Sequence, residues 1–66
     1  MLFETFLSKL KELKEGEERS YWHFGVKVSN VVSIYWRNRL ITEVETMAEA
    51  IMVLNAMYKM YKVEFE

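Results

Sequence analysis

The chain has 66 residues, of which 52% are hydrophobic and 15% aromatic, and nine basic against ten acidic residues give a net charge of −1. So many apolar residues exclude a disordered chain, and the near balance of charge excludes the basic surface of a general nucleic-acid binder. The absence of Cys excludes disulfides and Cys/His zinc sites. A domain of this size buries only about 60% of the surface of its unfolded chain, so we expect self-association to supplement a marginal core.

The N-terminal segment has the pattern of an amphipathic helix. Apolar residues at positions 2, 3, 6, 7, 10 and 13 recur every three or four residues, with polar side chains filling the other side. This spacing predicts a helix over residues 2–15. Gly16 is expected to end that helix in a left-handed conformation, and residues 15–20 form a charged connection.

The central segment predicts three strands. Apolar residues at positions 22, 24, 26 and 28 alternate along the chain, which predicts a strand over residues 20–28. Ser29-Asn30 and Arg37-Asn38 are predicted turns, so the next strands cover residues 31–36 and 39–44.

The strand registers stay open, because neither turn contains the Asn-Gly or Asp-Gly pair that best specifies a two-residue hairpin. Two-residue loops would place Val28 opposite Val31 and Trp36 opposite Arg39. A three-residue first loop would instead align positions 32, 34 and 36 with the apolar face of the first strand. We favour the second alternative because it gives the better core, although it demands a strained loop residue.

Thr46 and Glu49 form a T-x-x-E capping box immediately before an apolar run, which predicts a helix over residues 47–62. Residues 63–66 alternate and form either a short strand or a frayed end. The whole chain, residues 1–66, is therefore expected to be a single small α+β domain of α-β-β-β-α order. We expect a three-stranded antiparallel meander with both helices packed on one face.

The second helix is more apolar on its outer side than a small monomer requires. The residues on that side are Ala48, Met52, Asn55, Ala56 and Lys59. Small residues let another helix approach closely, and Met adapts to many binding surfaces. We assign these residues to self-association as a homodimer. The alternatives are cover by the first helix or the C-terminal tail within the monomer, and a different protein partner.

A cluster of aromatic and basic residues lies at the second predicted turn, and we assign it to partner binding. Its members are Tyr35, Trp36, Arg37, Asn38 and Arg39. Trp, Tyr and Arg dominate interface hot spots, and the same types stack on single-stranded bases. The cluster therefore favours a protein partner or, as the alternative, a nucleic acid. In the purely structural interpretation Trp36 belongs to the core and the Arg residues solubilise the turn.

No pattern for catalysis, cofactor or metal binding stands out. His23 lacks the nucleophile or orienting carboxylate that acid–base chemistry needs, and the chain contains no Asp. Glu43 and Glu45 are explained by a solvated strand end beside a helix N-terminus. The longest apolar run, residues 50–54, is far shorter than the roughly 18 residues of a membrane span. We expect a non-enzymatic cytoplasmic protein without cofactor, metal or membrane partner.

The predicted element order resembles that of the double-stranded-RNA-binding domain over residues 2–62. Phe24-x-Val26-x-Val28 resembles the first strand of that family, and Ala48 and Ala50 resemble its alanine-rich second helix. The resemblance implies RNA binding through a Lys-Lys-x-Ala-Lys run at the start of this helix. Here Glu45-Thr46-Met47-Ala48-Glu49 stands at that place, and its acidic residues would repel phosphate.

Taken together, these patterns predict a self-associating protein–protein interaction module, a small accessory or inhibitor protein that occludes or bridges a partner. The crowding of Met and aromatic residues without Cys or Pro suits an accessory protein of the kind phages use. The alternative is a nucleic-acid-binding domain that uses the aromatic and Arg residues of the second turn.

Overall fold

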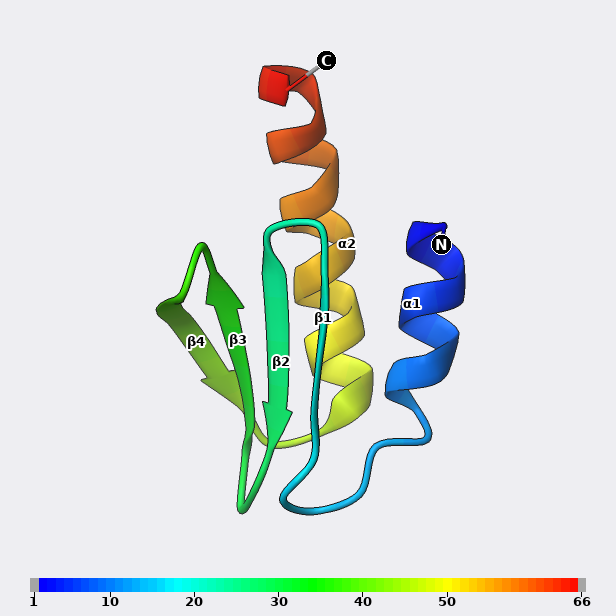
Figure 1. The fold of residues 1–66 in the computed structure, drawn as a ribbon. Coiled ribbons are helices and arrows are strands. Elements are labelled where there is room, and N and C mark those ends of the chain that lie inside the picture. The colour runs from blue at the N-terminus through cyan, green and yellow to red at the C-terminus, as the bar shows by residue number, and fades with distance from the viewer. Residues whose placement is uncertain (1, 66) are drawn as a thin grey trace.

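Four strands, rather than the expected three, form the sheet of this protein (Figure 1). The computed structural model describes residues 2–65. The elements in chain order are α1 (Phe3–Leu10), β1 (Glu18–Tyr21), β2 (Phe24–Val28), β3 (Val32–Trp36), β4 (Arg39–Val44) and α2 (Met47–Phe65). The strands form one antiparallel sheet in the order β1-β2-β3-β4. The element order is therefore α-β-β-β-β-α, and the order on which the family resemblance rested is wrong.

The additional strand arises because the segment expected as one strand, residues 20–28, is a hairpin. Tyr21 pairs with Phe24, so Trp22 and His23 form a two-residue loop between β1 and β2. Trp22 has a φ of 56°. A positive φ at the first loop residue is typical of a type II′ turn, in which glycine is favoured at that position. Neither loop residue is Gly, Asn or Pro, so the loop contains no residue type that would have predicted this turn.

The register between β2 and β3 is the one that the core pattern favoured. Val28 pairs with Val32 across a three-residue loop, and Val26 pairs with Ile34. The strained loop residue that this register was expected to demand is not found, because no residue of the loop has a positive φ. The next loop contains two residues, Arg37 and Asn38, with φ values of 51° and 68°. Positive φ at both positions is the pattern of a type I′ turn.

The first helix is shorter than the predicted 2–15, because α1 ends at Leu10. The N–H groups of Glu12 and Leu13 donate to carbonyl oxygens three residues earlier, each at 3.1 Å, which closes the helix with tight turns. Gly16 has the expected left-handed conformation, with a φ of 89°. It does not end the helix as expected. Instead its N–H donates to the carbonyl oxygen of Val28 in β2 at 2.8 Å.

The second helix begins where the capping box predicts. The backbone N–H of Glu49 donates to Thr46 Oγ1 at 3.2 Å, and α2 starts at Met47. The helix continues to Phe65, so residues 63–65 form no strand, and residue 66 lies outside the described residues. Over the described part of the chain, neither helix combines the length and apolar character needed to cross a membrane.

Both helices and alternate positions of β2 and β3 contribute to one core cluster. Its members are Phe3, Phe6 and Leu10 of α1, Phe24, Val26, Val32 and Ile34 of the sheet, and Ala50, Leu54 and Met57 of α2. The rings of Phe3 and Tyr58 stack with centroids 4.0 Å apart, which ties α1 to α2. This packing fixes the orientation of α2 and leaves its opposite side facing outward.

Candidate interaction surfaces

The five residues assigned to self-association lie together on the side of α2 that faces away from the core. We call Ala48, Met52, Asn55, Ala56 and Lys59 the outer surface of α2, and all of them are exposed. Met52 is 71% exposed. Because the apolar residues of α1 point into the core cluster, α1 does not cover this surface among the described residues. Cover by the first helix, which the sequence left open as one alternative, is thus not what the structure shows.

Charges are segregated along α2 and the residues that lead into it. Glu45 and Glu49 lie at the N-terminal end of α2, and Lys59 and Lys62 lie toward its C-terminal end. This order favours the helix itself, since acidic groups stabilise the positive end of the helix dipole and basic groups the negative end. The hydroxyl of Thr46 donates to Glu49 Oε1 at 3.3 Å, which holds one of the acidic side chains at the helix start.

The aromatic and basic residues at 35–39 do not form one surface. Tyr35 pairs with Gly25, whereas the neighbouring Trp36 pairs with Phe24 and packs against the core cluster. The Trp36 ring stacks on Tyr61 with centroids 4.2 Å apart. Successive residues of a strand point to opposite faces, so Tyr35 and Trp36 are separated by the sheet itself. Core packing accounts for the position of Trp36, as in the purely structural interpretation.

A different grouping forms where the β1–β2 and β3–β4 loops meet. We call Trp22, His23, Trp36, Arg37 and Asn38 the hairpin end. The backbone N–H of Arg37 donates to the carbonyl oxygen of His23 at 2.9 Å, which joins the two loops. The Trp36 ring lies 5.3 Å from that of Trp22 and 5.1 Å from that of His23, and 5.6 Å from the Arg37 guanidinium carbon. The hairpin end therefore presents aromatic rings and a cation on adjacent loops.

Sequence reasoning missed Trp22 and His23 because it placed them inside a strand. The signal that could have found them is the surplus of aromatic residues at 21–24, of which one alternating set would have faced solvent. A continuous strand would have exposed Tyr21. In the structure Tyr21 is half-buried, and its ring stacks on Phe6 with centroids 5.3 Å apart.

The strained φ of Trp22 gives an expected order of stability for two variants. Trp22→Ala and Trp22→Gly both lose the ring contacts with Trp36 and Tyr58. Only Gly adopts a positive φ without steric cost, so Trp22→Gly should be the more stable of the two by about 1 kcal/mol. Urea unfolding followed by circular dichroism measures this difference. If Trp22→Ala is the more stable variant, as in an ordinary strand, the loop conformation is wrong.

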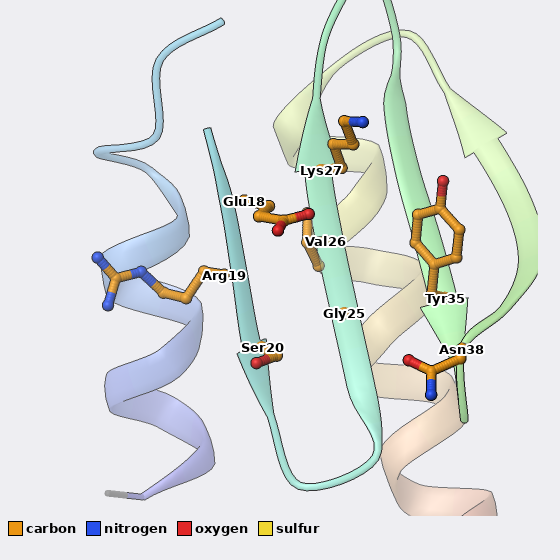
Figure 2. Close-up of a pocket in the computed structure, with 8 residues that line it drawn as sticks. All are labelled: Glu18, Arg19, Ser20, Gly25, Val26, Lys27, Tyr35 and Asn38. Atoms are coloured by element: carbon orange, nitrogen blue, oxygen red, sulfur yellow. The ribbon is translucent and has the colours of Figure 1, made fainter. Parts of the chain in front are cut away.

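A shallow hollow of about 520 Å³ lies on the face of the sheet where Tyr35 stands (Figure 2). It is lined by Glu18, Arg19, Ser20, Gly25, Val26, Lys27, Tyr35 and Asn38. Gly25 has no positive φ, and a Cβ built on it would meet the Cβ of Tyr35 at 3.6 Å, an ordinary contact. Neither backbone conformation nor packing therefore requires glycine here, and its effect is to keep the hollow open.

Replacing Gly25 with Ala is expected to raise the free energy of unfolding by roughly 0.5–1 kcal/mol, because Ala restricts the unfolded chain more than Gly does. Thermal unfolding of the native chain and of Gly25→Ala, at equal concentration, measures the change. A loss of stability would show that the Tyr35 side of the hollow cannot accept a methyl group.

The described residues bring no three His or Glu side chains together in a way that could hold a metal ion. The His23 ring contacts the rings of both Trp22 and Trp36, and Glu43 accepts a hydrogen bond from the Ser33 hydroxyl at 3.4 Å. Comparison of the chain with protein-family models, curated proteins and solved structures finds no match.

Proposed function

We propose that this protein is a non-enzymatic protein–protein interaction module that self-associates through the outer surface of α2 and acts as a small accessory or inhibitor protein. The observation that carries the proposal is the 71% exposure of Met52 in the middle of this surface. Fully burying a Met side chain stabilises a complex by roughly 1.5–3 kcal/mol. A two-fold interface buries the same side chain twice, because each copy offers the same surface.

The residues around Met52 suit a helix partner. Ala48 and Ala56 lie one turn away on either side and are exposed. Their small side chains let a second helix approach closely, and the flexible Met side chain fills irregular space between two helices. A surface of one helix is small, so we expect a dissociation constant of the order of micromolar, typical of interfaces below about 1,200 Å².

The hairpin end supports a second contact, with another protein. It carries two Trp residues and Arg37, the residue types that contribute most to interface hot spots. Trp22 is 40% exposed, so part of its side chain is accessible at this end of the sheet. Self-association and partner binding therefore use different parts of the molecule.

The alternative function, nucleic-acid binding through Tyr35, Trp36, Arg37 and Arg39, has less support. One face of the Trp36 ring stacks on Tyr61 and is not open to a base. The start of α2 carries Glu45 and Glu49 where phosphate contacts would need cations. A binding constant for a single-stranded oligonucleotide that fell steeply with salt would restore this alternative.

Sedimentation equilibrium of the native chain tests the proposed self-association. Over a range of about 1–200 μM, which brackets a micromolar dissociation constant, the average mass should rise from the monomer's 8.0 kDa toward twice that value. A mass that stays at the monomer value throughout this range would contradict the proposal.

A further inference from the structure

The order of charges on α2 distinguishes the two directions in which a second copy of the helix can pair with it. Glu45 and Lys59 lie seven residues before and after Met52. Seven residues are close to two helical turns, so Lys59 lies within about 20° of Met52 around the helix. Glu45 lies two residues before Met47, the first residue of α2, and is therefore near the N-terminal end of the outer surface. Glu45 and the outer surface of α2 together thus have an acidic end, a centre of Ala48, Met52 and Ala56, and a basic end.

In an antiparallel pair centred on Met52, opposite charges face each other. The N-terminal end of each copy, which carries Glu45 and Glu49, faces the end of the other copy that carries Lys59, and this arrangement occurs twice because of the two-fold symmetry. Ala48 of one copy meets Ala56 of the other, which leaves room for the two Met52 side chains between them. A parallel pair would place each Glu45 beside the other Glu45 and each Lys59 beside the other Lys59, and such like-charge contacts disfavour an interface.

The hairpin end lies beside the C-terminal half of α2. Trp36 contacts Tyr61, with ring centroids 4.2 Å apart, and Trp22 contacts Tyr58 at 5.6 Å. Figure 1 shows the loop between β1 and β2 at the same end as this half of the helix. In an antiparallel pair the two hairpin ends therefore point in opposite directions. With a rise of 1.5 Å per residue, the two copies of Tyr61 are separated by roughly 27 Å along the helix axes.

We infer that two copies of this chain pair through α2 in an antiparallel direction around a two-fold axis at Met52, and that the dimer bridges two partner molecules instead of occluding one. This inference rests on the proposed self-association and adds the relative direction of the two α2 helices. The dimer displays its two hairpin ends at opposite poles, so each can hold a separate copy of the partner. A parallel dimer would bring both hairpin ends together on one target.

Disulfide trapping tests the direction of pairing. The chain contains no Cys, so an introduced thiol has no competitor. Ala48→Cys and Ala56→Cys are mild changes at exposed positions. In the antiparallel dimer residue 48 of one copy meets residue 56 of the other. Two copies of residue 48 lie roughly 12 Å apart along the axis, beyond the approximately 7 Å that a disulfide spans.

The experiment mixes Ala48→Cys with an Ala56→Cys chain that carries a mass tag, in a glutathione buffer that allows exchange. We expect the mixed disulfide to exceed either symmetric disulfide by at least about fivefold, and each variant alone to remain largely uncrosslinked. Met52→Cys is the control for the interface, because residue 52 meets its own copy in either direction.

Two results would overturn the inference, and they are distinguishable. If Met52→Cys crosslinks while Ala48→Cys and Ala56→Cys each crosslink with themselves and form little mixed disulfide, the self-association stands but the antiparallel direction is wrong, because a parallel pair separates residues 48 and 56 by roughly 12 Å. If Met52→Cys does not crosslink and the native chain sediments as a monomer, the proposed function itself fails.

Discussion

Met52→Lys is expected to be a folded monomer at concentrations where the native chain is expected to dimerise. The monomer tolerates this change, because the side chain at position 52 is 71% exposed and makes little contribution to the core. In the proposed dimer the change removes the apolar contact of Met52 in both copies and brings two ammonium groups together at the two-fold axis. Lost burial of about 3 kcal/mol in total corresponds to more than a hundredfold weaker dissociation constant, before any repulsion is counted.

Met60→Lys is the matched control for this experiment. Met60 is the same residue type on the same helix and is 62% exposed. It lies about 80° around the helix from Met52, outside the centre of the surface. Sedimentation equilibrium should show a dimer for Met60→Lys and a monomer for Met52→Lys, with matching circular dichroism spectra. If the two variants behave alike, the outer surface of α2 is not the interface.

Local patterns predicted the second helix well. The capping box of Thr46 and Glu49 set its first residue, and a period of 3.6 placed Met52 outward and Leu54 inward, at 71% and 0% exposed. Both signals depend only on residues within a few turns of each other, so they do not depend on contacts between residues distant in the sequence. The β2–β3 register followed from the same logic, because only one alignment places both sets of apolar residues on one face.

The hairpin at Trp22 could not be predicted in the same way. Turn prediction relies on residues that adopt a positive φ cheaply, and Trp is not among them. Contacts distant in the sequence compensate the strain, since Trp22 packs against Trp36 and Tyr58. Because the hairpin was not predicted, β1 was not predicted either. The hairpin end could then not be recognised, since it forms only where the β1–β2 loop meets the β3–β4 loop. The division of residues 35–39 between two faces, by contrast, follows from strand geometry alone.

Phe6→Ala is expected to cost about 3–5 kcal/mol of unfolding free energy, the usual loss for a fully buried aromatic ring. Phe6 is 0% exposed and contacts the rings of Phe3 and Tyr21, with centroids 6.2 and 5.3 Å away. A domain of this length has a total stability of roughly 3–10 kcal/mol. The variant should therefore be largely unfolded at the lower end of that range. An eight-residue helix is not stable alone, so α1 depends on this packing.

Leu2→Ala is the control, because Leu2 precedes α1 directly and is 72% exposed. Its unfolding free energy should stay within about 0.5 kcal/mol of the native value. Urea unfolding followed by circular dichroism measures the native chain and both variants at one equal concentration, so that any stability added by self-association enters all three measurements alike. If Phe6→Ala loses no more than Leu2→Ala, then α1 does not close the core. The dimer surface would in that case have to be reconsidered, because α1 would be free to cover the outer side of α2.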